Sequence, residues 1–134
     1  MIAPDSSVLI AALASHHAAH ERAIDAVGNS PRLIVHVAFE TSSVLSRMPE
    51  EQRMEASFVL DALEREFPGP WLALDQAAQR SCLRRAVGAG LRGGALYDAL
   101  IAATARQHGA MLLSADRRAR EAYEAIGVDV SYLE

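Results

Sequence analysis

Four acidic side chains occupy comparable points of the sequence, each just after a short apolar run or early in the helix that follows one. They are Asp5, Glu40, Asp98 and Asp116. In an open α/β sheet such positions lie along one edge, where ligands bind. Four carboxylates gathered there would repel one another unless cations neutralised them. The pattern therefore predicts a site for Mg²⁺ or Mn²⁺, which prefer oxygen ligands and can activate a water against a phosphodiester.

Each acid also has a purely structural interpretation. Asp5 and Asp116 stand at helix starts and can act as N-caps, a role worth about 1 kcal/mol. Glu40 can be a solvent-facing helix residue, although it lies among apolar positions where an unpaired buried charge would be costly. Asp98 is the hardest to explain in this way, because Ala, Leu and Ile cover nearly every face of its helix. Asp75 has no comparable placement, and we expect it only to cap the helix that begins there.

The elements that must position these acids alternate along the chain. Short apolar segments predict about five strands, over residues 1–4, 33–35, 71–74, 111–113 and 128–130. Helical spacing predicts helices between them, over residues 6–13, 18–27, 37–47, 49–67, 75–87, 95–108 and 114–126. This alternation predicts a mostly parallel central sheet with helices on both faces, a three-layer α/β/α fold. One domain over residues 1–134 is expected.

Two helices carry expectations about particular residues. Pro49, followed by Glu50 and Glu51, predicts a helix that begins at the proline, because proline and acids favour the first turn. In the preceding helix we expect Phe39 and Leu45 on the apolar side.

Composition excludes several classes of protein. The net charge of −4 argues against binding nucleic acid by bulk electrostatics alone. The chain contains no lysine, which excludes a Walker-type phosphate loop. Phosphoaspartate receivers and haloacid-dehalogenase-like phosphatases also depend on a lysine as families.

The chain shows no sign of export. The single cysteine, Cys82, cannot form an internal disulfide, which agrees with a reducing compartment. The first residues lack a signal peptide's basic start, and no apolar run approaches the ~20 residues of a membrane span. We therefore expect a cytoplasmic protein with no membrane contact.

Four sequence signatures together resemble a known family. They are DSS at residues 5–7, FET at 39–41, YDALIAA at 97–103 and LLSAD at 112–116. In this order they resemble the PIN-domain ribonucleases, specifically the VapC-type toxins of toxin–antitoxin pairs, and the resemblance covers essentially the whole chain. The last two signatures are the most specific.

The resemblance implies roles for particular residues. Asp5, Glu40, Asp98 and Asp116 become the catalytic acids that hold one or two Mg²⁺ or Mn²⁺ ions. Ser114 lies where many relatives carry a supporting threonine, and Ser6 is a second supporting candidate. Some relatives have a further acid shortly after the last one, whereas two arginines and an alanine follow here, so the number of metals stays open.

The resemblance also implies an activity and partners. It implies a metal-dependent endoribonuclease that cleaves structured RNA such as tRNA, inhibits translation and growth, and forms a homodimer. A cognate VapB-type antitoxin would neutralise it. We expect the helices over residues 36–67 to carry much of the dimer or antitoxin surface.

Arginines are the candidates for RNA contacts, because a guanidinium binds phosphate through two hydrogen bonds. Arg92 precedes the helix that carries Asp98, and Arg117 follows Asp116, so these two are preferred. His16 and His20 have the spacing of a shared helix face, but no suitable third zinc ligand lies near them in the sequence.

Two rival functions stay open. One is a non-catalytic module that keeps the fold and uses its acidic groove to bind a protein partner. The other is a structure-specific DNA nuclease, although the chain lacks room for the insertions that would thread a DNA flap.

Overall fold

In the computed structural model, which describes residues 1–133, three parallel strands form the central sheet. They are β1 (Ile2–Pro4), β2 (Met111–Ser114) and β3 (Val130–Tyr132), in the order β1-β2-β3. Ala3 pairs with Leu112, and Leu112 pairs with Val130. The start of the chain therefore lies beside a strand from near its end.

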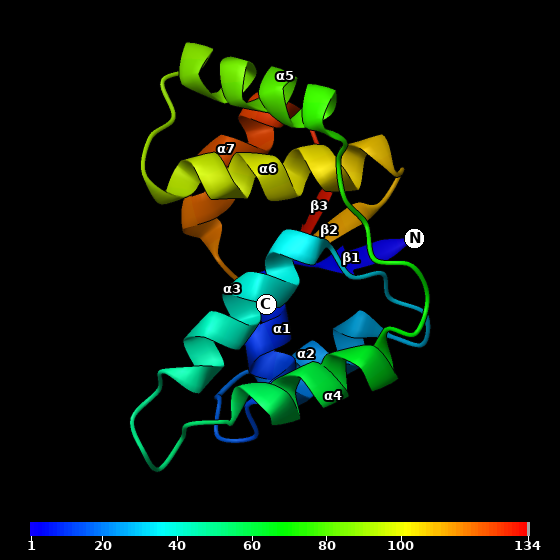
Figure 1. The fold of residues 1–134 in the computed structure, drawn as a ribbon, viewed down its shortest axis with the longest axis vertical. Coiled ribbons are helices and arrows are strands. Elements are labelled where there is room, and N and C mark those ends of the chain that lie inside the picture. The colour runs from blue at the N-terminus through cyan, green and yellow to red at the C-terminus, as the bar shows by residue number, and fades with distance from the viewer. Residues whose placement is uncertain (134) are drawn as a thin grey trace.

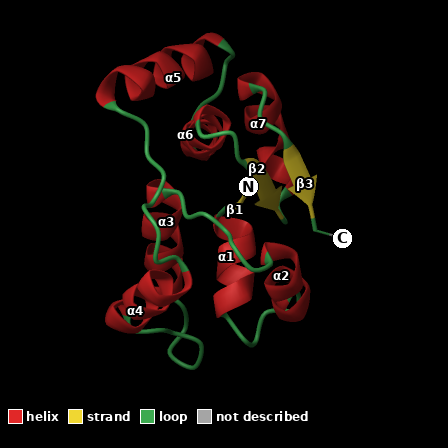
Figure 2. Ribbon diagram, turned by 90° about the vertical axis from the view of Figure 1, so that its right-hand side faces the viewer, coloured by secondary structure: helices red, strands yellow, loops and turns green. Residues whose placement is uncertain are grey.

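Helices from the first half of the chain cover one face of this sheet and extend away from it (Figures 1 and 2). These helices are α1 (Ser6–Leu13), α2 (His20–Val27), α3 (Val35–Ser46) and α4 (Ala56–Glu66). α1 packs against α2, β1 and α3, and α3 packs against α4.

Helices from the second half cover the opposite face, as Figure 2 shows. They are α5 (Gln76–Gly88), α6 (Gly94–Gln107) and α7 (Arg120–Ile126), with a short 3₁₀ helix, η1 (Arg117–Ala119), leading into α7. α6 packs against both α5 and α7. The expected three-layer α/β/α fold is confirmed. Within residues 1–133, no helix is both long and apolar enough to cross a membrane.

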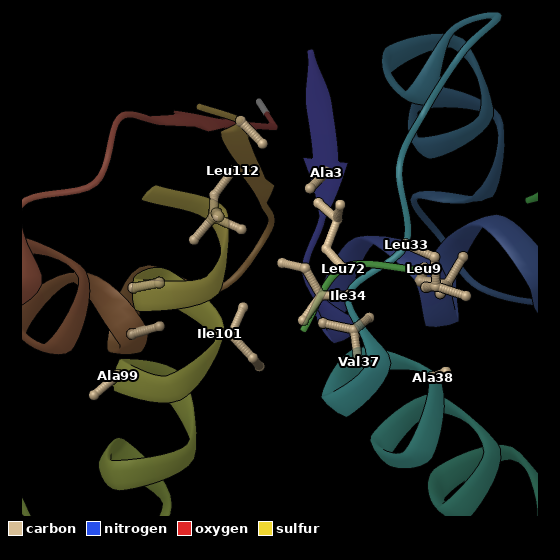
Figure 3. Close-up of a cluster of buried hydrophobic side chains, with 14 of the residues drawn as sticks. Ala3, Leu9, Leu33, Ile34, Val37, Ala38, Leu72, Ala99, Ile101 and Leu112 are labelled. Atoms are coloured by element: carbon tan, nitrogen blue, oxygen red, sulfur yellow. The ribbon is translucent and has the colours of Figure 1, made fainter. Parts of the chain in front are cut away.

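Small and branched side chains fill the core, as the low aromatic content requires. Figure 3 shows Ile101 and Leu112 on one side and Ile34, Leu72 and Val37 on the other, all buried. The inner face of α6 is built from alanines that have no measurable exposure: Ala99, Ala102 and Ala105. Short side chains allow neighbouring helices to approach closely, which holds α6 firmly beside the sheet.

The prediction of about five strands was wrong in number. Residues 33–35 and 71–74 form one isolated parallel bridge, between Ile34 and Leu72, and do not join the sheet. Two hydrogen bonds make this bridge: Val35 N–H donates to the Leu72 carbonyl at 2.9 Å, and Leu72 N–H donates to the Leu33 carbonyl at 2.7 Å. α3 begins at Val35, so the first segment ends before a longer ladder can form.

The last strand and two helix starts also differ from expectation. The helix expected over residues 114–126 begins only at Arg117, with η1, because β2 continues to Ser114. β3 occupies Val130–Tyr132 and not residues 128–130, because the Val128 N–H is used to cap α7 by donating to the Tyr123 carbonyl. α4 begins at Ala56 and not at Pro49. The intervening segment begins as a turn, in which Gln52 N–H donates to the Pro49 carbonyl at 2.8 Å, and Met54 N–H then donates to the Leu45 carbonyl of α3 at 3.0 Å. In contrast, the cap expected at the start of α5 is present: Asp75 accepts a hydrogen bond from the Ala78 N–H at 2.8 Å.

Candidate active site

Asp5 occupies the junction between β1 and α1 and is almost fully buried, with 3% of its surface exposed. Its Oδ1 accepts hydrogen bonds from the Val8 N–H at 3.2 Å and the Ser7 hydroxyl at 2.5 Å. Its Oδ2 accepts a hydrogen bond from the Tyr123 hydroxyl at 2.6 Å. Asp5 is therefore an N-cap of α1 and, at the same time, a buried carboxylate held by groups from two ends of the chain.

Ser7 links the loop after β1 to the loop after β2 at this edge of the sheet. Its hydroxyl donates to Asp5 and accepts the Ala115 N–H, just after β2, at 2.8 Å. Ser6 was the serine expected to support the site, yet within residues 1–133 the side-chain hydrogen bonds at this position belong to Ser7. Both hydroxyls suit a helix start, and only the packing of β1 against β2 distinguishes them.

Glu40 projects from the second turn of α3 and is partly buried. Its Oε1 is buried and has no hydrogen-bond partner among residues 1–133, and its Oε2 lies 3.8 Å from His36 Nε2. The His36 ring stacks on Tyr97 of α6, with ring centroids 4.9 Å apart and an interplanar angle of 6°. This stack holds α3 beside the turn of α6 that carries Asp98.

The pKa of Asp98 is affected by the charges of the other three acids. Burial first, and then the negative charges of Glu40, Asp5 and Asp116 in that order, raise its pKa, while Arg118 lowers it; together they bring it from 3.8 to about 6. Because like charges must be close to act in this way, the fold brings these carboxylates into one electrostatic cluster. Perturbed carboxyl groups of this kind concentrate at functional sites.

Asp116 lies just after β2, and its hydrogen bonds are to residues near it in the sequence. Its Oδ1 accepts the Arg118 backbone N–H and the Arg118 Nε, both at 3.0 Å. Its own N–H donates to the hydroxyl of Ser114, which is fully buried, at 3.1 Å. Ser114 thus fixes the loop that carries Asp116.

Tyr123 is a site neighbour that the sequence analysis did not identify. It lies on α7, is 2% exposed, and has its pKa raised by burial first and then by the charge of Asp5 and their hydrogen bond. Its sequence context, between Ala122 and Glu124, predicts only a core-facing helix position. Nothing in the sequence pairs it with an acid 118 residues earlier.

The four acids are close enough to influence one another electrostatically, but they do not form a complete metal-coordination shell. Within residues 1–133 no group of three or more acidic, histidine or cysteine side chains is arranged closely enough to hold an ion as it stands. The chemistry nevertheless fits a hard divalent cation, because the donors are all carboxylate oxygens and one of them, Glu40 Oε1, is buried with no hydrogen-bond partner among residues 1–133. Of the two histidines considered as a zinc pair, His16 is exposed, and His20 Nδ1 donates a hydrogen bond to the Ala11 carbonyl at 2.9 Å.

The arginines near the acids differ in what they contact. The Arg117 guanidinium lies 4.9 Å from the centre of the Tyr132 ring, a cation–π contact on β3. Arg118 is the arginine that binds an acid of the cluster, with its side chain 93% exposed. Arg92 is exposed in the loop before α6.

An exposed apolar face adjoins the acids. Phe39 is 71% exposed, so the expectation that it packs on the apolar side of α3 was wrong. Tyr97, Leu83 and Val87 are also more than half exposed. A hollow of about 600 Å³ between α5 and α6 is lined by residues that include Leu83 and Tyr97. We call these four side chains, on α3, α5 and α6, the apolar face.

Comparisons with known proteins agree with this geometry. A family model described as "PIN domain" matches residues 2–125. Ribonuclease VapC40 of Mycobacterium tuberculosis is 42% identical over 130 residues, which cover 97% of each chain. Ribonuclease VapC27 of the same organism is 35% identical over 130 residues, covering 96% of this chain and 94% of that one. The crystal structure of VapBC2 from Rickettsia felis, bound to a promoter DNA fragment, has a TM-score of 0.68 at 16% identity and covers 100% of both chains.

Proposed function

Because the chain belongs to the PIN-domain family and is similar throughout to VapC ribonucleases, we propose that it is a metal-dependent endoribonuclease toxin that hydrolyses phosphodiester bonds in structured RNA. The proposed substrate class is tRNA, and the proposed consequence is inhibition of translation and growth. One observation carries the proposal: Asp98 lies on a buried helix within the electrostatic reach of Asp5, Glu40 and Asp116.

In this proposal each acid has a part in holding one or two Mg²⁺ or Mn²⁺ ions. Asp5 is the fixed member, because hydrogen bonds restrain both of its oxygens. Glu40 offers a buried oxygen with no partner among the described residues. Asp98 gains most from a cation, because a cation would offset both the burial and the neighbouring negative charges that raise its pKa. When bound, such an ion activates water and stabilises charge on the phosphate oxygens.

Hydrolysis of this kind has a defined pair of products. Attack by water on phosphorus, with departure of the 3′ oxygen, leaves a 5′-phosphate and a 3′-hydroxyl. No side chain forms a covalent bond to the RNA. A 2′,3′-cyclic phosphate end would show that the RNA's own 2′-hydroxyl attacks, and would contradict the mechanism.

We further propose two protein partners. A cognate VapB-type antitoxin is supported by the likeness to VapBC2. A hollow of about 380 Å³ between α1, α2 and α4, lined in part by Leu9, Ile24 and Phe67, can receive an apolar segment of that antitoxin. A second copy of the chain is supported by the apolar face, because its four large apolar side chains are each more than half exposed, as at surfaces where proteins associate.

The test is cleavage of total RNA by protein purified free of any partner, with Mg²⁺, with Mn²⁺ and with EDTA. Discrete fragments that require the metal and disappear in Asp98→Asn would support the proposal, and sequencing their ends would identify the substrate and the products. The substitution keeps the shape of the side chain and removes its charge. Absence of cleavage by a folded, metal-loaded sample across total RNA would favour the rival, a PIN-fold module that only binds a protein.

A further inference from the structure

The hydrogen bond between Tyr123 and Asp5 has a consequence for how Asp5 can bind a cation. An ionised carboxylate offers about four acceptor positions, two on each oxygen. Asp5 Oδ1 uses both of its positions, for the Ser7 hydroxyl and the Val8 N–H. Asp5 Oδ2 uses one, for the Tyr123 hydroxyl at 2.6 Å. Among the hydrogen bonds that residues 1–133 make, this leaves one acceptor position, on Oδ2.

Tyr123 is well placed to decide where that remaining position points. The side chain is 2% exposed and packs in the core through α7, so the ring has little freedom to move. Its short hydrogen bond holds Oδ2 on one side, while Ser7 and the α1 N-terminus hold Oδ1 on the other. The carboxylate plane of Asp5 is thereby restrained from both ends.

We propose that Tyr123 is a positioning residue for the cation site: its hydroxyl orients Asp5 so that this acid binds a divalent ion through a single oxygen, Oδ2. The inference rests on the proposed function, because it presupposes that the acid cluster holds a divalent ion. Outer-shell partners that orient a metal-binding side chain typically change metal affinity by 10–100-fold when removed. Tyr123 does not itself touch the ion or the substrate.

The test is to measure Mn²⁺ binding to the full chain without RNA, using electron paramagnetic resonance to quantify the free ion. Tyr123→Phe keeps the buried ring and removes only the hydroxyl, and its expected effect is a 10–100-fold loss of Mn²⁺ affinity. Tyr132→Phe is the matched control, because this tyrosine lies on β3 against Arg117. Its Mn²⁺ affinity should equal that of the wild type.

A double-mutant cycle separates positioning from a general structural effect. In Asp5→Asn, which preserves the N-cap, Tyr123→Phe should cause little further loss of Mn²⁺ affinity, because the carboxylate it positions has gone. Equal losses in both backgrounds would overturn the inference, as would wild-type affinity in Tyr123→Phe. If the wild type itself bound no Mn²⁺, the proposed metal site would fail and this inference with it, and that result is distinct because it appears before any substitution.

Discussion

The hydroxyl of Ser7 accepts a hydrogen bond from the backbone N–H of Ala115 at 2.8 Å, across 108 positions of the sequence. The same hydroxyl donates to Asp5, so one side chain joins the loop after β1 to the loop after β2. These two loops carry the first and the last of the four acids. Their separation is therefore set by a serine that is not itself an acid or a ligand.

Ser7→Ala should destabilise the protein by about 1–3 kcal/mol, because it removes a charge-assisted hydrogen bond to Asp5 and leaves the Ala115 N–H without its partner. Urea unfolding of the metal-free protein measures this loss. Ser6→Ala is the control and should change the unfolding free energy by less than about 0.5 kcal/mol. Equal effects of the two substitutions would show that the bridge contributes nothing specific.

Asp98 should make the metal-free protein less stable as the pH rises from about 4 to about 6. Its pKa is about 6 in the folded protein and near 3.8 when unfolded, so the folded state binds the extra proton in this interval. The unfolding free energy therefore falls as that proton is lost. Melting curves in EDTA across this range provide the measurement.

The same experiment on Asp98→Asn tests the assignment. This variant should lose that part of the pH dependence and, in EDTA at pH 7, should melt above the wild type. Asp75→Asn is the control, because Asp75 caps α5 and is exposed. If Asp98→Asn and the wild type show parallel melting profiles, neither burial nor the neighbouring acids raise the pKa of Asp98 enough to affect stability.

Arg118→Ala should weaken RNA binding more than Arg117→Ala, because Arg118 lies at the acid cluster whereas Arg117 packs on Tyr132. Loss of one phosphate contact lowers the slope of log affinity against log salt by about 1. Fluorescence anisotropy with a labelled tRNA, in an Asp98→Asn background that prevents cleavage, measures that slope. Arg92→Ala tests the remaining candidate.

The control for the arginine series is Arg84→Ala, an exposed substitution on α5. It should leave both the affinity and the salt slope unchanged. A slope equal to that of the parent protein for Arg118→Ala would exclude this residue from the RNA path, even if cleavage were impaired.

Leu83→Asp should convert a dimer into a monomer, because it places a charge in the centre of the apolar face. Light scattering coupled to gel filtration measures the mass directly. Ile24→Asp, at a comparably exposed residue on α2 and outside the apolar face, is the control and should remain dimeric. A monomeric wild type at high concentration would contradict the proposed dimer.

Much of the fold could be inferred from local sequence patterns. Period-3.6 apolar spacing identified every long helix, and the cap at Asp75 was predicted from its place before α5. Such features depend on neighbours within a few residues, so a single sequence contains them. The predictions for residues 33–35 and 71–74 were wrong because a short apolar run does not reveal how many partners a strand will find.

The identity of the four acids also came from the sequence, as types and spacings that match the family signatures. Their electrostatic coupling did not, because it depends on distances between α1, α3, α6 and the loop after β2. Tertiary structure alone decided that Ser7 bridges two loops, that Tyr123 reaches Asp5 and that Phe39 faces solvent. The first two are contacts between segments far apart in the chain, and the third depends on which face of α3 other elements cover. Local propensity carries no information about either.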